Sequence, residues 1–140
     1  METLRERIKR HEGLRLTPYR DSEGFWTVGR GHNMDNPISG AAADMIFEDD
    51  LSAAVNDFKK LSPWMPPFLK QARVEVLVEM IFQLGIGGVL KFKRMLAALR
   101  QENYDSAADE MLDSLAARQT PERWKELSGI MRTGDSDPLN

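Results

Sequence analysis

The stretch RHEGLRLTPYRDSEGFWTVGRGH, residues 10–32, combines two strand-forming runs with acidic residues, of which Glu12 and Asp21 lie in contrasting positions. The runs LRLTPYR and FWTVG contain the β-branched and aromatic residues that favour strands, and the tetrapeptide DSEG between them favours a turn. This pattern predicts a β-hairpin. Glu12 comes just before Gly13, and Asp21 opens the predicted turn nine residues later. One carboxylate therefore precedes the hairpin and the other lies in its turn.

The residues before the hairpin, 3–12, have the pattern of a helix. Thr3 and Glu6 have the spacing of a capping box, in which each residue satisfies a backbone N–H of the other. A glycine just past the last turn is a common helix stop, so Gly13 is expected to end this helix. Glu12 is then expected at the C-terminal end, beside the unpaired carbonyl groups of the last turn.

From residue 39 onward the sequence is typical of helices separated by turns. Ser39 is expected to cap the first of them, and the segment SPWMPP to end it. The segment ARVEVLVEMIFQLG leaves little room for a polar face, which indicates a buried central helix. The glycines of GIGG, residues 85–88, predict a tight connection. The final helix is expected to begin with Thr120 as N-cap and Pro121 at the first helical position, and to end at Gly134.

The expected fold class is α+β, predominantly helical with a small N-terminal β-hairpin. At 140 residues the chain is predicted to form one domain over residues 1–134. The hairpin lobe is expected at 13–38, and the helical body at 39–134 with the N-terminal helix 3–12. A loose tail is expected at 135–140. A cleft between the lobe and the body is the natural place for a ligand.

Composition excludes several classes of protein. The formal net charge is −3, with 19 basic and 22 acidic residues mixed along the chain, so the basic footprint of a nucleic-acid-binding protein is missing. The sequence has no cysteine and two histidines, and neither a metal nor a cofactor is expected. It has no apolar run long enough for a secretory signal or a membrane span. We therefore expect a soluble, unexported protein without membrane insertion.

Two carboxyl groups in different environments are what glycosidic bond cleavage requires, one as an acid and one as a base or nucleophile. A general acid that works near neutral pH needs a raised pKa, and helix-terminal carbonyl groups favour this. Glu12 has such a position, whereas a turn leaves Asp21 near backbone donors and water. Spacing alone is weak evidence, because most acidic residues are solvated surface charges.

The order of residues in this stretch resembles the N-terminal signature of the phage-type lysozymes, the muramidase family of the T-even phages and phage endolysins. The segments EMIFQLGIGG and QTPERW…IMRTG resemble the central helix and the C-terminal segment of that family. The resemblance covers nearly the whole chain and implies a lysozyme-like fold. The residues that match the signature in order and spacing are Glu12, Gly13, Tyr19, Asp21, Gly24, Thr27, Gly29, Gly31 and His32.

The resemblance implies roles for three of these residues. Glu12 corresponds to the general acid, Asp21 to the carboxylate that assists the attacking water, and Thr27 to the hydroxyl residue that positions this water. The implied reaction is hydrolysis of the β-1,4 bond between N-acetylmuramic acid and N-acetylglucosamine, with inversion by a single displacement. The implied substrate is bacterial peptidoglycan.

Further residues match positions that contact the substrate or hold the family fold together. Arg132 matches an arginine that pairs with the catalytic glutamate, although an arginine in a last helical turn also complements the helix dipole. His32 and Asp50 match a structural pair that ties the hairpin to the helical body. The remaining expected substrate contacts are Gln83, Phe82 and Asn33, with a core position as the alternative for Phe82.

Two alternatives to a muramidase stay open at this point. One is a non-catalytic wall-binding or scaffold module, which would not need Glu12, Asp21 and Thr27 together. The other is a lytic transglycosylase, which uses one acid and no water. As a muramidase, the protein is expected to be a monomer that is cytoplasmic in the producing cell. It would then need a holin-type permeabilising partner to reach periplasmic peptidoglycan.

Overall fold

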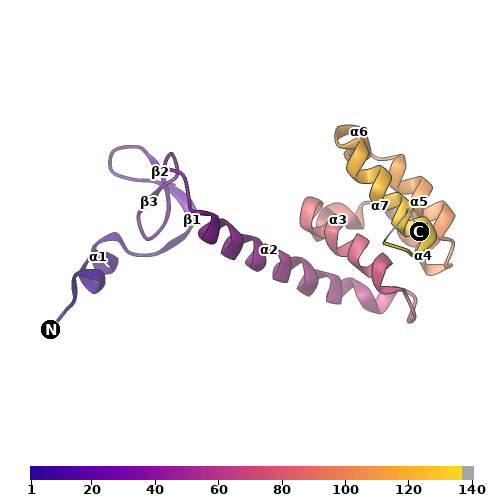
Figure 1. Cartoon of the computed structure of the whole chain (residues 1–140), viewed down its shortest axis with the longest axis horizontal. Coiled ribbons are helices and arrows are strands. Elements are labelled where there is room, and N and C mark those ends of the chain that lie inside the picture. Colours follow the sequence, from indigo (N-terminus) through magenta and orange to yellow (C-terminus); the bar gives the residue numbers. More distant parts are fainter. Residues whose placement is uncertain (137–140) are drawn as a thin grey trace. The chain divides into compact units, whose positions relative to one another are not determined.

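The computed structural model describes residues 1–136, and the chain divides into two compact units, residues 1–45 and residues 46 onward (Figure 1). The predicted single domain over residues 1–134 stays a prediction. Most of the expected loose tail, from residue 137, lies outside the described residues. No helix within the described range has both the length and the apolar character needed to cross a membrane.

The first unit contains one helix and a three-stranded antiparallel sheet in the order β1-β2-β3. The predicted hairpin is confirmed as β1 and β2. The third strand is an addition to the prediction, because a strand of two residues has no periodicity to detect. The elements are α1 (Leu4–Glu12), β1 (Arg15–Arg20), β2 (Trp26–Gly29) and β3 (His32–Asn33).

Both ends of α1 are fixed as its sequence predicts. The Glu6 N–H donates to Thr3 Oγ1 at 3.1 Å, and the Thr3 N–H donates to Glu6 Oε2 at 2.8 Å, which confirms the capping box. These bonds from Thr3 hold the pKa of the Glu6 carboxyl below its ordinary value. Gly13 has a positive φ of 73°, and its N–H donates to the Lys9 carbonyl at 2.8 Å. Glu12 is therefore the last residue of α1.

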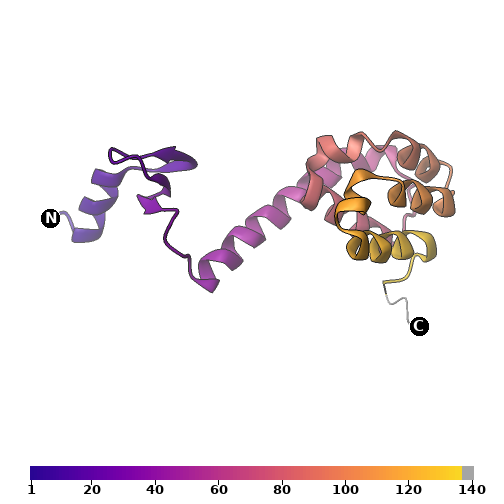
Figure 2. The same cartoon turned by 90° about the horizontal axis from the view of Figure 1, so that it is seen from above.

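The second unit is helical, and its helices α3 to α7 lie side by side in both views (Figure 2). The break predicted at GIGG is confined to Gly85, with φ 74° and ψ 160°, after which α3 resumes. The elements are α2 (Gly40–Leu61), whose first turns belong to the first unit, the 3-10 turn η1 (Ser62–Trp64), α3 (Gln71–Leu90), α4 (Lys93–Arg100), α5 (Tyr104–Leu112), α6 (Leu115–Gln119) and α7 (Pro121–Thr133).

The helix caps confirm most of the predicted boundaries. The Ala42 N–H donates to Ser39 Oγ at 3.1 Å, so Ser39 caps α2 as expected. Pro121 begins α7, and Gly134 ends it in a left-handed conformation. Thr120 occupies the N-cap position of α7 as predicted, but its side chain makes no capping bond, because its hydroxyl donates to the Ala116 carbonyl of the short helix α6. Helix α6 was not predicted, and it supplies the carbonyl group that accepts this hydrogen bond.

The core of the second unit is built around α3 and α7. Trp124 on α7 is fully buried, and its ring stacks on Phe92 with a centroid distance of 5.8 Å and an interplanar angle of 3°. The predicted buried central helix is confirmed, since Leu77 and Met80 on α3 are also fully buried. Met95 at the start of α4 completes this layer.

Arg73 joins α3 to the C-terminal end of α7 from a buried position. Its Nε donates to the Met131 carbonyl at 2.7 Å, and its Nη2 donates to the Arg132 carbonyl at 3.1 Å. The guanidinium carbon lies 3.5 Å from the centroid of the Tyr104 ring on α5. One cation thus caps carbonyl groups at a negative helix end and stacks on an aromatic face.

Replacing Arg73→Ala is expected to lower the free energy of unfolding by about 3 kcal/mol, because two charge-assisted hydrogen bonds and a cation–π contact are lost together. Arg73→Lys is expected to lose less, since it keeps the charge but not the planar fork. Denaturant unfolding of both variants measures this. Equal stability of Arg73→Ala and the wild type would show that the buried cation contributes nothing.

Candidate active site

Glu12 lies against Gly31 in the Gly-Arg-Gly turn that joins β2 to β3. Gly31 in this turn has a φ of +80°, and a Cβ added to it would lie 2.6 Å from Glu12 Oε2 and 2.8 Å from Glu12 Cδ. Such distances are shorter than any stable contact between these atoms. Gly29, with a φ of +70°, has nothing within 4 Å of its own added Cβ. Both glycines thus permit the turn, but only Gly31 also leaves room for the Glu12 carboxyl group.

Asp21 closes the turn between β1 and β2 with its side chain. Its Oδ1 accepts hydrogen bonds from the N–H groups of Glu23 and Phe25, both at 2.9 Å. Its own N–H donates to the Phe25 carbonyl at 2.9 Å, and Gly24 supplies the positive φ that the turn requires. Since both bonds are made to Oδ1, Oδ2 is available to another donor.

Thr27 lies on β2, directly opposite Tyr19 on β1 and Asn33 on β3. It is only 3% exposed, and its Oγ1 donates to the Phe25 carbonyl at 2.9 Å. Because its proton is used in this bond, Oγ1 presents lone pairs to any other partner. The backbone of Phe25 therefore contacts both predicted water-handling residues, through its N–H to Asp21 and its carbonyl to Thr27. This role of Phe25 was not predicted from the sequence, because every residue has the same backbone N–H and carbonyl groups and the residue type does not reveal their partners.

His32 and Asn33 form the short strand β3. The Asn33 side-chain oxygen accepts a hydrogen bond from the Asp35 N–H at 2.9 Å. Nε2 of His32 is buried and has no hydrogen-bond partner among residues 1–136. Asp50, the partner expected for His32, lies on α2 in the second unit. The His32–Asp50 pair and the substrate contact of Asn33 stay predictions.

Gln83 and Phe82, two expected substrate contacts, lie together on α3 in the second unit. Oε1 of Gln83 is buried and accepts no hydrogen bond within the described part of the chain. A buried amide oxygen without a donor is costly, so it favours a ligand or a water molecule at this point. Phe82 is 42% exposed and lies outside the core cluster, with its ring 5.8 Å from the ring of Phe47.

An ion pair that the sequence analysis missed lies close to Phe82. Arg123 Nε donates to Glu79 Oε2 at 2.9 Å, across 44 residues of sequence. Both residues line a cavity of about 310 Å³, together with Phe47 and Phe82. No local pattern links α3 to α7, so this pair was not predictable from spacing.

Arg132 has partners within its own unit. Its Nη2 donates to Asp109 Oδ1 at 2.7 Å, and its Nη1 donates to Asp105 Oδ1 at 3.3 Å. The bond to Asp109, aided by Asp105, raises the pKa of the Arg132 guanidinium. These contacts join α7 to α5, and they support a structural role. Its expected pairing with Glu12 stays a prediction.

The expected site residues thus fall into two groups. The first unit holds Glu12, Asp21, Thr27, His32 and Asn33, and its chemistry is that of two carboxyl groups and one hydroxyl. The second unit holds the other expected residues, which are Asp50, Phe82, Gln83 and Arg132. Across residues 1–136, no group of three or more His, Cys, Asp and Glu side chains is arranged to hold a metal ion.

Comparison with known proteins finds relatives that are named lysozymes and endolysins. The chain is 27% identical to probable T4-type lysozyme 1 of Dictyostelium discoideum, over 96% of each protein, in an alignment of 164 positions. This alignment is longer than the chain, so the relative has residues that the chain lacks. The chain is also 30% identical to the endolysin of Salmonella phage P22, over 76% of each protein.

A third relative is a larger protein. The chain is 32% identical to pre-baseplate central spike protein Gp5 of Enterobacteria phage T4, over 95% of the chain and 28% of that protein. The family model for phage lysozyme matches residues 9–132, which confirms the resemblance and the α+β fold class. The chain therefore belongs to the phage lysozyme family.

Proposed function

We propose that this lysozyme hydrolyses the β-1,4 bond between N-acetylmuramic acid and N-acetylglucosamine in bacterial peptidoglycan, with Glu12 as the general acid and with Asp21 and Thr27 holding the attacking water. Membership of the phage lysozyme family supports peptidoglycan hydrolysis. The relatives are named a T4-type lysozyme and an endolysin, and these names support an enzyme rather than a binding module.

The reaction follows from the groups in the first unit. The Glu12 carboxylic acid donates its proton to the glycosidic oxygen, and the bond between this oxygen and the anomeric carbon breaks. Water attacks the anomeric carbon from the opposite face and gives a proton to Asp21. The products are two sugar chains, one with a new hydroxyl group that carries the Glu12 proton and one with a new reducing end that carries the OH of the water. Asp21 then releases its proton to solvent and Glu12 takes one up, so the overall reaction consumes one water molecule.

The observation that carries this proposal is the shared contact of Asp21 and Thr27 with Phe25. In the proposed mechanism a water molecule donates one proton to Asp21 Oδ2 and one to Thr27 Oγ1, which can accept because it already donates its own proton to the Phe25 carbonyl. The lone pair of this water is then directed away from both acceptors. An inverting hydrolase needs a nucleophile oriented in this way.

The same contact argues against a lytic transglycosylase. That reaction closes a ring within the muramic acid and consumes no water, so a water-holding pair has no use in it.

We further propose that the protein acts as a monomer on peptidoglycan after release from the producing cell, with a holin-type permeabilising partner. The P22 relative is named an endolysin, which supports this setting.

Wall clearing by the purified chain tests the assignment of Glu12. Glu12→Gln is expected to lower the clearing rate by about 10²- to 10⁴-fold, because a positioned general acid contributes about that much. The matched control is Glu126→Gln, the same change at an exposed position of α7, which is expected to clear at the wild-type rate.

The sugar ends of the products separate the alternatives. Reducing ends are expected from the wild type, whereas 1,6-anhydro ends would identify a transglycosylase. A wild-type chain that binds walls and releases no fragments would be a binding module. Equal clearing by Glu12→Gln and the wild type would remove Glu12 from the mechanism.

The space beside Gly31 gives a second test with a matched control. Gly31→Ala and Gly29→Ala each place an alanine at a positive φ, which costs about 1–2 kcal/mol of stability. Only the methyl group at position 31 meets the Glu12 carboxyl group. Gly31→Ala is therefore expected to lower the clearing rate by about 10²-fold, since a displacement of about 1 Å is enough for such a loss.

Gly29→Ala is expected to keep the clearing rate within a few-fold of the wild type while its melting temperature falls as much as that of Gly31→Ala. Calorimetry and clearing assays on the two variants measure the two effects separately. A loss of activity of the same size in both variants would mean that backbone strain, and not contact with Glu12, limits the reaction.

A further inference from the structure

Two aromatic side chains stand out from the connection between α2 and α3 in the second unit (Figure 1). We call this connection, residues 62–70, the aromatic loop. Its Trp64 is 65% exposed and its Phe68 is 91% exposed. Side chains of this size and apolar character are normally buried for the most part. A phenyl ring with so little cover projects from the surface and does not line a groove.

Core packing accounts for only half of the apolar residues in the aromatic loop. Met65 is buried in the core of the second unit, and Leu69, four residues later, packs against that core. Trp64 and Phe68 have the same spacing but lie outside the core cluster. The loop is also stiff, because three of its residues are prolines and the Met65 N–H donates to the Ser62 carbonyl at 3.0 Å. The two exposed rings are therefore presented on a fixed backbone.

Basic residues flank the aromatic loop. Between residues 58 and 74 the sequence has four basic residues and no acidic one, although the net charge of the whole chain is −3. Three of these cations, Lys59, Lys60 and Lys70, are exposed. Arg100 at the end of α4 adds a fourth, since its guanidinium carbon lies 5.9 Å from the centroid of the Trp64 ring. Within the described residues only Lys60 among these four forms an ion pair.

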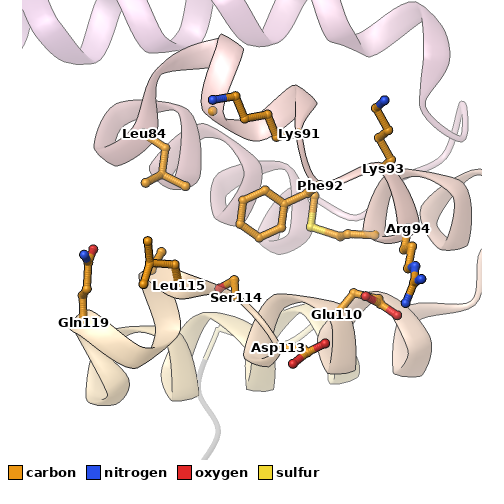
Figure 3. A pocket seen from close by; sticks show the side chains of 13 residues that line it. Leu84, Lys91, Phe92, Lys93, Arg94, Glu110, Asp113, Ser114, Leu115 and Gln119 are labelled. Carbon is orange, nitrogen blue, oxygen red and sulfur yellow. The ribbon is translucent and has the colours of Figure 1, made fainter.

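The charge around the aromatic loop differs from that of the largest groove in the second unit. This groove of about 600 Å³ opens between the start of α4 and the connection from α5 to α6 (Figure 3). Lys93 and Arg94 line one of its sides, and Glu110 and Asp113 line the other. Charges of both signs on one surface largely cancel at a distance. The sequence around the aromatic loop lacks this balance, so its positive potential extends farther into the solvent.

We propose that the aromatic loop binds the surface of an anionic phospholipid bilayer. Trp64 and Phe68 enter the headgroup region, where aromatic side chains are enriched in membrane-bound proteins. Lys59, Lys70 and Arg100 lie near the lipid phosphates and balance their negative charge.

Two features favour a bilayer over a protein as the occupant of this surface. A protein partner would need a preformed cavity for two rings on a stiff loop, whereas lipid headgroups rearrange around them. The exposed cations of the loop also match a surface of one sign of charge. Contact of this kind holds a protein on the membrane and needs no helix that spans it.

Sedimentation of the full chain with lipid vesicles tests this proposal. The probes are vesicles of phosphatidylcholine alone and vesicles in which about one third of the lipid is phosphatidylglycerol. Binding to the anionic vesicles is expected to be at least about tenfold tighter, because each basic residue near such a surface contributes about fivefold. Tryptophan emission is expected to shift to shorter wavelength on binding. Trp64→Phe is expected to abolish this shift and to keep most of the binding.

Two variants separate the apolar and the charged contributions. Phe68→Ser is expected to weaken binding to the anionic vesicles about tenfold. Lys59→Gln combined with Lys70→Gln is expected to weaken it by at least about the same factor.

Each variant has a matched control in the second unit. Leu115→Ser changes an apolar side chain on α6 that is 65% exposed, and Lys93→Gln combined with Arg94→Gln removes the same charge from α4. Both controls are expected to bind as the wild type does. All of these positions are exposed, so the melting temperatures are expected to stay close to that of the wild type.

Three results would overturn the proposal. They are equal binding to both kinds of vesicle, unchanged binding by Phe68→Ser, and a loss of the same size in the matched controls. Absence of binding to either vesicle would also overturn it and would point to a protein as the occupant. Phe68→Ser is expected to clear isolated walls at the wild-type rate, since they contain no bilayer. A failure of the proposed hydrolysis would therefore appear in the clearing assay and not here.

Discussion

The turn closed by Asp21 is the constraint on which the geometry of the first unit depends. Its carboxylate accepts hydrogen bonds from two backbone N–H groups. The Phe25 carbonyl in turn accepts hydrogen bonds from the Asp21 N–H and from the Thr27 hydroxyl. The sheet register then places Thr27 opposite Tyr19 and Asn33. Hydrogen bonds to ionised groups are stronger than those between neutral groups, so this turn is well suited to hold a water-binding pair in one arrangement.

The second carboxyl group is positioned by different means. A helix stop at Gly13 makes Glu12 the final residue of α1, and a missing side chain at Gly31 leaves room for its carboxyl group. Glu12 and Asp21 therefore meet different surroundings, one beside helix-terminal carbonyl groups and one among backbone donors. In the proposed mechanism Glu12 is the acid and Asp21 is the carboxylate that accepts a proton from the water.

Local patterns were enough to predict much of this fold. The capping box of Thr3, the hairpin with its turn at Asp21, and the helix ends at Gly13 and Gly134 depend on residues within a few positions of each other. Each was confirmed. The strand β3 and the helix α6 were missed, because two and five residues are too few to show a period.

Contacts between distant parts of the sequence were not predictable in this way. Arg73 caps carbonyl groups 58 and 59 residues away, and Arg123 pairs with Glu79 across 44 residues. A groove of about 600 Å³ in the second unit likewise joins residues of α4 to residues of α5 and α6. The Gly-x-Gly motif indicated a turn, but the approach of Glu12 to Gly31 is visible only in three dimensions.

The measurement that tests the central claim most directly is the configuration of the newly formed reducing end. In the proposed mechanism a water held by Asp21 and Thr27 attacks in a single displacement, so cleavage of the β-linked substrate is expected to give the α-anomer first. Proton NMR during the first minutes of hydrolysis, before the anomers equilibrate, distinguishes the two forms. Initial release of the α-anomer is the predicted result. Initial release of the β-anomer would mean a double displacement and would contradict the roles given to Asp21 and Thr27.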